Sequence, residues 1–357
     1  MRHPAPFPVL ALPALLLYAS CGSEPDPGIL PVGDLSPPVL VSAEPEGSRG
    51  FDLRFDEAIA PIAGSFTLEA PSGESSACEP KVRDRELRLG FPADTEPGAA
   101  YALCGEVEDG GGNSTRFALR FYGWNPHPAS LRLSEIQTAK NGSATKPHRD
   151  FVEFEALSAG NLGGLELSWA SAAKAYSYRF PGAEVARGDL VVLHLAPEGL
   201  PAEKDECAGD LALSGGTDAA PCARDFWSAA GGLPDASGVL VLRPRSGERP
   251  VDGLFYVEYG RSGVLSDEKL AGLVAELVAG GLWPAGGDKP SWDDGFRWKP
   301  SASRSLCRVP SGASSSAGAT TCGGWYLSGS GSQSPGARNP PPGESGDRPA
   351  RKPTRYP

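Results

Sequence analysis

The sequence predicts an all-β protein of two β-sandwich domains in tandem, the second with a helical insertion. Glycine and proline are abundant, with 46 and 36 among 357 residues, which favours short strands joined by turns over long helices. Apolar and polar residues alternate with a period of two in several segments, as in strands that bury one face. Clusters of Pro, Ser, Gly and Asn separate these segments and indicate turns.

Residues 1–20 have the features of an export signal peptide, which is removed before folding. Arg2 and His3 provide a positive start, and the apolar run over 7–18 is shorter than the roughly 20 residues that span a bilayer. The following Ala19-Ser20-Cys21 resembles the lipobox of bacterial lipoproteins. The resemblance implies cleavage before Cys21, acylation of its thiol with palmitate-type chains, and an outer-membrane lipoprotein of the cell envelope. Tyr18 stands where that family prefers Leu, so an ordinary cleavable signal with an incidental cysteine stays open.

Residues 21–38 would then join the lipidated cysteine to the first domain as a polar, Pro-rich linker. The formal net charge of the chain is −11. An acidic surface repels phosphate backbones, which argues against nucleic acid as a partner.

Six cysteines remain beyond the lipobox, an even number that suits an oxidising compartment. Proximity in the sequence favours three disulfide pairs, although buried free thiols remain the alternative. A zinc site is poorly supported, because no C-x-x-C pair occurs and the four histidines are scattered. The predicted pairs are Cys78–Cys104, Cys207–Cys222 and Cys307–Cys322.

Residues 39–123 are predicted to form the first domain, with alternating strands over 51–55, 87–91 and 117–121. Short strands with regular turns indicate a small Greek-key sandwich. The run Phe55-Asp56-Glu57-Ala58-Ile59, a strand at Tyr101 and a turn over 109–113 resemble bacterial Ig-like domains of surface-layer and adhesin-type proteins. The resemblance implies an Ig-like β-sandwich.

The second domain is predicted over residues 129–340, after a boundary at 123–128 that contains two prolines. A helix is expected to begin at a Ser266 cap and to end at Gly280-Gly281, with Leu270, Leu273, Val274 and Leu277 on one face that covers the sandwich. Strands are predicted over 131–136, 151–154, 165–169, 176–180, 190–195, 239–242, 254–259 and 305–309.

Short motifs along the second domain resemble the lamin-tail domain, an Ig-like β-sandwich common in exported bacterial proteins. In chain order they are Ser134-Glu135-Ile136, Asp150-Phe151-Val152-Glu153-Phe154, Leu165-Glu166-Leu167, Phe180-Pro181, Gly188-Asp189-Leu190-Val191-Val192, Ser305-Leu306-Cys307-Arg308, Trp325 and Ser334-Pro335-Gly336-Ala337-Arg338-Asn339. The chain departs from the family at Glu155-Ala156, where Tyr-Asn is frequent. Extra length at 200–235 and 260–300 is where a binding function of this chain's own is expected.

Few residues offer chemistry for a reaction. No G-x-S-x-G, P-loop or H-E-x-x-H motif occurs, and no cofactor or metal is expected. Glu135 and Glu153 could ligate calcium or act as acids, but the lamin-tail pattern favours hydrogen bonding within the sandwich. The aromatic cluster Trp292, Phe296 and Trp298 is a candidate ligand contact if exposed, and part of the core if buried.

The sequence therefore predicts a non-enzymatic, lipid-anchored envelope protein with a binding, adhesive or structural role. The first domain would act as a spacer, and loops of the second would contact an envelope or host protein or a polysaccharide. The alternative is an accessory binding subunit of an extracellular hydrolase, because lamin-tail domains are often joined to nucleases and phosphatases. Residues 341–357 are Pro-rich and basic and are expected to be a disordered tail.

Overall fold

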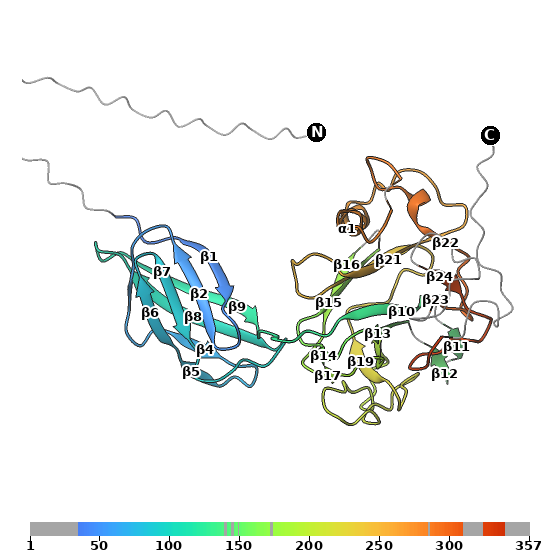
Figure 1. Ribbon diagram of the computed structural model, residues 1–357, viewed down its shortest axis with the longest axis horizontal. Helices are drawn as coiled ribbons and strands as arrows, with labels where there is room; N and C mark the ends of the chain where they lie inside the picture. Colours follow the sequence, from blue (N-terminus) through green and yellow to red (C-terminus); the bar gives the residue numbers. More distant parts are fainter. Residues whose placement is uncertain are drawn as a thin grey trace, which may run out of the picture.

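The computed structural model describes residues 35–138, 141–143, 146–148, 150–171, 174–284, 286–309 and 324–339. Within these residues the chain forms 24 strands, one α-helix and one short 3-10 helix. The prediction of an all-β protein is confirmed. Figure 1 shows two groups of strands side by side along the long axis, one ending at residue 122 and the other beginning at residue 131.

The first group consists of two sheets that share one hydrophobic core. Strand β2 buries Phe51, Leu53 and Phe55 on one face, because successive side chains of a strand point to opposite faces. One sheet has the order β1-β2-β7-β6, and the other β3-β8-β4-β5 with β9 beside β8. The bounds are β1 Leu40–Pro45, β2 Gly50–Phe55, β3 Ala60–Pro61, β4 Thr67–Glu69, β5 Ser75–Ala77, β6 Glu79–Arg83, β7 Glu86–Gly90, β8 Ala100–Glu108 and β9 Ser114–Tyr122.

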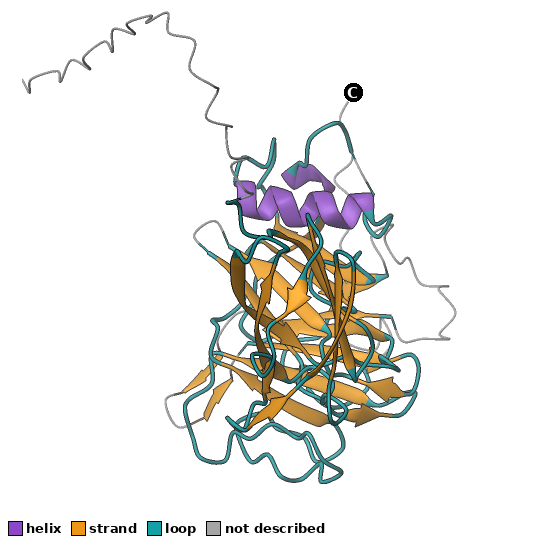
Figure 2. Cartoon of the chain, turned by 90° about the vertical axis from the view of Figure 1, so that its left-hand side faces the viewer, coloured by secondary structure: helices purple, strands orange, loops and turns teal. Residues whose placement is uncertain are grey.

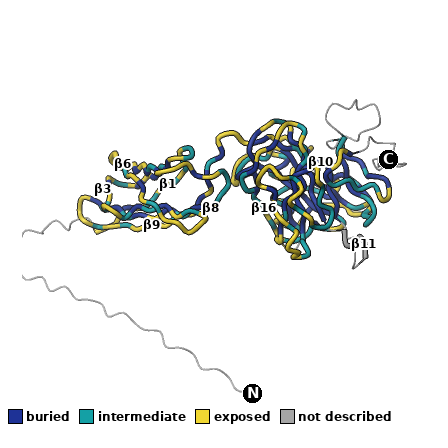
Figure 3. Tube along the Cα trace, turned by 90° about the horizontal axis from the view of Figure 1, so that it is seen from below, coloured by how far each residue is buried: buried dark blue, intermediate teal, exposed yellow. Residues whose placement is uncertain are grey.

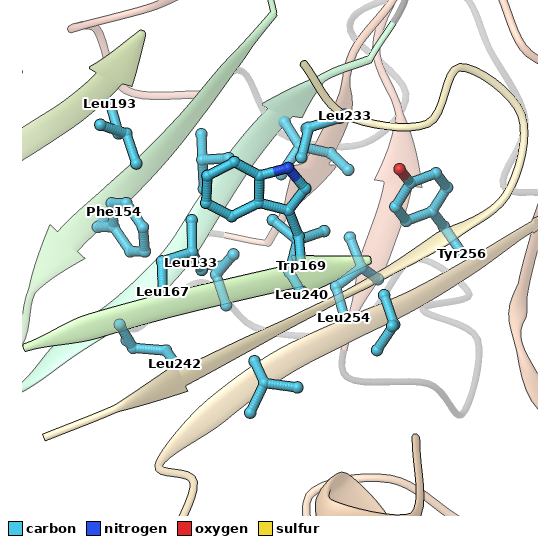
Figure 4. Close-up of a cluster of buried hydrophobic side chains, with 14 of the residues drawn as sticks. Leu133, Phe154, Leu167, Trp169, Leu193, Leu233, Leu240, Leu242, Leu254 and Tyr256 are labelled. Carbon is cyan, nitrogen blue, oxygen red and sulfur yellow. The ribbon is translucent and has the colours of Figure 1, made fainter. Parts of the chain in front are cut away.

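The second group also has two main sheets, of six and five strands, around a larger core. The six-stranded sheet has the order β19-β18-β13-β10-β23-β24 and the five-stranded sheet β16-β15-β20-β21-β22. Trp169 is fully buried between them among leucines of both sheets (Figure 4). The bounds are β10 Leu131–Gln137, β13 Phe151–Ala156, β15 Glu166–Ala170, β16 Ala175–Arg179, β18 Leu190–Leu195, β19 Arg224–Ser228, β20 Gly238–Arg243, β21 Asp252–Glu258, β22 Phe296–Trp298, β23 Leu306–Arg308 and β24 Trp325–Leu327, with short pairs β11 Asn141–Ser143 and β12 Lys146–His148, and β14 Gly160–Asn161 and β17 Glu184–Val185.

Helix α1, Glu268–Ala279, lies across strands of the second group (Figure 2). It buries Leu270, Val274 and Leu277 against the core, and Arg243 of β20 forms an ion pair with Glu276 on its side. The predicted helix and its covering role are confirmed. Its N-cap is Asp267 and not Ser266, because the Asp267 carboxylate accepts the N–H groups of the first turn.

All eight strands predicted in the second domain are present, within one or two residues of their expected ends. Seven further strands were not predicted: the short strands β11, β12, β14 and β17, and β19, β22 and β24. Strand β19 begins with Arg224 and Asp225, which are charged and yet buried, so its sequence lacks an alternating pattern. Strands β22 and β24 have three residues each, too few to show a period.

A close contact joins the two groups at residues 123–128, and Figure 3 shows a narrow connection between two bodies that each have their own buried interior. Asn125 donates its side-chain N–H groups to the carbonyls of Asn161 and Gly163 at 2.9 and 2.8 Å. A Cβ on Gly98 would lie 2.5 Å from the backbone nitrogen of Gly164, so glycine permits this approach. The guanidinium of Arg179 lies 3.5 Å above the Tyr122 ring and adds a cation–π contact.

Candidate functional site

Two glutamates, Glu135 and Glu153, lie buried side by side on the six-stranded sheet. They are direct cross-strand partners on β10 and β13, and neither is accessible to solvent. Cross-strand partners point to the same face of a sheet. This face is opposite the main core, because neighbouring Ile136 and Phe154 belong to that core. The arrangement therefore places two carboxyl groups together in a dry environment.

Hydroxyl and backbone donors surround the pair. Glu135 accepts hydrogen bonds from the Ser305 hydroxyl and from both the backbone N–H and the hydroxyl of Ser334. Glu153 accepts from the Ser134 hydroxyl and from the Gly336 N–H, the latter at 2.8 Å. Buried polar groups are normally satisfied in this way. All five donors belong to the chain itself, so the pair is occupied without a ligand.

Burial raises the pKa of both carboxyl groups. For Glu135 desolvation outweighs the hydrogen bonds from Ser305 and Ser334, which favour the ionised form. For Glu153 desolvation comes first, and the charge of Glu135 raises its pKa further, well above the ordinary value of 4.5. The Cys307 thiol faces the same pair, and burial followed by the charge of Glu135 raises its pKa well above 9.0.

The segment 334–339 closes over this pair, and we call it the strap. Beyond the bonds from Ser334 and Gly336, the side chain of Asn339 donates to the Ser134 carbonyl at 2.9 Å. On its other side the strap packs against the long insertion between β18 and β19, where a Cβ on Gly336 would lie 2.2 Å from Cβ of Ala220. The strap is therefore enclosed between the sheet and the insertion.

A second buried polar cluster fixes that insertion. His194 Nε2 lies 2.7 Å from Asp225 Oδ1, and the His194 ring stacks on Trp227 with centroids 4.1 Å apart. The other oxygen of Asp225 accepts the N–H of Ala220, and its backbone N–H donates to Glu206. His194, Glu206 and Asp225 are 0 to 1% exposed. A His–Asp pair with so little access positions the loop and presents no base to a substrate.

A polar hollow of about 580 Å³ lies on the first group, over the outer face of the sheet β1-β2-β7-β6. Its floor carries oppositely charged cross-strand partners: Asp52 faces Arg88, and Arg54 faces Glu86. Arg88 forms ion pairs with Asp52 at 2.9 Å and with Glu46 at 2.8 Å. Lys81 and Arg83 on β6 form one edge of the hollow. Exposed ion pairs of this kind contribute little to stability.

The aromatic cluster is buried, so the ligand contact that depended on its exposure is not available. Trp292, Phe296 and Trp298 are 7, 4 and 1% exposed and belong to the main core. The indole N–H of Trp298 donates to the Ala236 carbonyl at 2.9 Å, which satisfies its polar atom inside the protein. The cluster is core, the alternative that the sequence left open.

Two predicted disulfides are absent, since Cys78, Cys104, Cys207 and Cys222 are free thiols. Cys78 faces the core of the first group, whereas Cys104 lies on the exposed face of β8. Cys222 donates to the Gly336 carbonyl at 3.2 Å, while the carbonyls on either side of Cys207 bind Arg224, so the two thiols have different surroundings. Cys307 is buried and free. Its proposed partner Cys322 and the lipidation candidate Cys21 lie outside the described residues.

The sequence identified Glu135, Glu153 and the strap motif, but not that they bind one another. It also missed the His194–Asp225 pair, for which two residues 31 positions apart give no local signal. No cluster of three or more His, Cys, Asp or Glu suited to a metal occurs in the part of the chain that is described. None of its helices is long and apolar enough to cross a membrane.

The family model of the TP_1001 protein second domain matches residues 129–326, more than half of the chain. The chain belongs to this family. The match spans β10 to β24 and so includes Glu135, Glu153, His194 and Asp225 within the TP_1001 second-domain region. An uncharacterized protein of Treponema pallidum (strain Nichols) is 29% identical over 204 residues. The aligned part covers 54% of this chain and 50% of that protein, so the chain matches about half the length of this relative.

Proposed function

We propose that this protein is a non-enzymatic, lipid-anchored component of the bacterial cell envelope that binds a protein or polysaccharide. The observation that carries the proposal is that four side chains of the second group suited to acid–base chemistry are buried and hydrogen-bonded within the chain. Glu135, Glu153, His194 and Asp225 are all 0 to 1% exposed. Catalysis requires groups that reach a substrate, so these groups serve the fold.

The two groups of strands are proposed to be tandem Ig-like sandwiches, the second of lamin-tail type. Paired sheets around a shared core support this proposal in each group. The motifs that resemble the lamin-tail family occupy core and strap positions, including Glu135, Glu153 and the strap itself. This assignment supports a binding or structural role by analogy of fold alone.

The polar hollow is proposed as the contact surface, in place of the loops of the second domain. Its edge residues Lys81 and Arg83 offer cations for carboxylate or phosphate groups of an envelope polymer or an acidic protein surface. The outer face of β1-β2-β7-β6 also lies on the domain that follows the proposed anchor. A ligand held there would be close to the membrane.

The anchor is tested by growing the expressing bacterium with labelled palmitate. Wild-type protein is expected to take up label, and Cys21→Ala is expected to lose it. Cys104→Ala, which removes an exposed thiol elsewhere, is the matched control and keeps its label. Label retained in Cys21→Ala would contradict lipidation at this residue.

The contact surface is tested with Lys81→Glu/Arg83→Glu on a glycan array and in crosslinked envelope fractions. We expect loss of at least about tenfold of wild-type capture, as for charge contacts at a binding surface. Glu74→Gln, an exposed change on a turn of the same domain, should capture as the wild type does. Equal capture by all three proteins would reject the hollow, and turnover of ester, glycoside or phosphate substrates by pure protein would reject the non-enzymatic role.

A further inference from the structure

The strap is fastened to the buried glutamate pair from both of its halves. Ser334 binds Glu135 through two donors, and Gly336 binds Glu153 through its backbone N–H. These contacts cross 199 and 183 residues of sequence. Two of these three donors, the backbone N–H and the hydroxyl, belong to Ser334, and the third is the backbone N–H of Gly336. The position of the strap therefore depends on where the two carboxylates lie.

Two of the three arginines near the pair are engaged with other acids, and the third, Arg338, lines the same cleft as Glu153. From β10, Arg132 binds Glu155 of β13 at 2.7 Å, and from β23, Arg308 binds Asp252 at 2.6 Å. The remaining titratable groups that face the pair are Cys307 of β23 and Tyr326 of β24, with Arg338 on the strap and Cys222 on the insertion. No ion pair joins Lys or Arg to Glu135 or Glu153 among the described residues.

Two adjacent carboxylates that form no ion pair with a cation resist double ionisation, because each charge repels the other and neither is hydrated. The pair therefore titrates as one unit that retains a proton under conditions in which a surface glutamate is ionised. One negative charge is well supported by the five donors, whereas a second is repelled by the first and stays dehydrated until the strap opens and admits water.

A small cleft borders one member of the pair. A cleft of about 20 Å³ is lined by Glu153 together with Arg132, Arg338 and Asn339. That volume is close to the minimum that holds one water molecule. Arg338 and Asn339 belong to the strap, so the same segment forms a wall of this cleft and the cover of the pair.

We infer that the strap is a pH-sensitive latch, closed while Glu135 and Glu153 share a proton and loosened when that proton is lost to water and both carboxylates are charged. Opening would separate Gly336 from Glu153 and uncover Ala223, which lies beside Gly336 and belongs to a small apolar cluster with Phe151 and Val192. The latch couples the acidity of the envelope to the exposure of this face. It does not depend on what the polar hollow binds.

Hydrogen exchange of the mature full-length protein tests the latch at the amides of Ser334 and Gly336. Rates are corrected for intrinsic exchange and compared between about pH 5 and about pH 9, since local opening is read directly from protection. We expect opening to increase at least tenfold over this range, and Glu153→Gln to reduce the change to about twofold or less. Glu135→Gln provides the same test independently if Glu153→Gln folds poorly.

Two further variants test whether the pH dependence comes from the two glutamates. Ser334→Ala should open the strap at every pH, because it removes a donor without changing the acids. Glu74→Gln, exposed on the first domain, should keep the wild-type pH dependence. The latch is rejected if strap protection in the wild type is independent of pH, or if its pH dependence persists in both glutamine variants.

Discussion

The backbone N–H of Gly336 lies 2.8 Å from Oε2 of Glu153, a contact between residues 183 positions apart. It attaches the last described segment of the chain to β13 in the middle of the six-stranded sheet. Gly336 adopts a left-handed φ of 77°, and its α-carbon has no room for a side chain beside Ala220. Gly336 therefore combines a backbone conformation and a close contact that require glycine with a hydrogen bond to the buried glutamate pair.

Gly336→Ala is expected to destabilise the second domain by about 2–4 kcal/mol, because it combines left-handed backbone strain with a steric clash. Gly331→Ala is the matched control, since Gly331 has a similar φ of 73° but nothing within 4 Å of the added carbon. Its effect should be about 1 kcal/mol. Urea unfolding followed by tryptophan fluorescence measures both, and equal losses would show that the contact with Ala220 is unimportant.

The free energy of unfolding should fall as pH rises. The pKa of Glu135 and of Glu153 is raised in the folded protein, so the folded state holds protons more tightly than the unfolded chain, whose glutamates titrate near 4.5. The stabilisation is complete below that value and is lost as pH rises from it through the raised pKa. Urea unfolding at several pH values should show a shallower decline for Glu153→Gln than for the wild type.

Trp298→Ala is expected to cost about 3–5 kcal/mol of stability, as for large core aromatics. The side chain is 1% exposed and its indole N–H holds the loop at Ala236. Any ligand bound at the polar hollow should keep its affinity in protein that remains folded. Unchanged thermal unfolding combined with lost binding would restore the ligand-contact hypothesis for this tryptophan.

Asp225→Ala is expected to release the insertion between β18 and β19, because it leaves the buried His194 and the part-buried Ala220 N–H without their partner. Each such group costs about 1–3 kcal/mol. Trypsin should then cut after the exposed Lys204 severalfold faster, while cleavage after Lys269 on α1 stays constant. Asp210→Ala, whose carboxylate accepts the N–H of nearby Ala212, should leave both rates as in the wild type.

Local patterns predicted most of the fold. Period-two alternation located β2, β7 and β9, and the i, i+3, i+4, i+7 spacing of Leu270, Leu273, Val274 and Leu277 located α1. Strand β19 was missed because Arg224 and Asp225 are buried by tertiary hydrogen bonds and not by their hydrophobicity. The predicted disulfide between Cys78 and Cys104 is absent although the two are close in the sequence, because Cys78 faces the core and Cys104 lies on the exposed face of β8.

The sequence identified residues of the candidate site, but not how they are arranged in space. The motifs at Glu135, Glu153 and Ser334 each stand out locally, yet the hydrogen bonds that join them span 183 and 199 residues. No periodicity carries information over that distance. The pair is covered by a strap that is close to it in space but far from it in the sequence.

The intact mass of the mature protein purified from membranes tests the anchoring at the centre of the proposed function most directly. The expected species begins at Cys21 and is heavier than the polypeptide from residues 21 to 357 by a diacylglyceryl group, with or without a further acyl chain. A species that retains Met1, or one cut at the signal peptide with an unmodified cysteine, would contradict it.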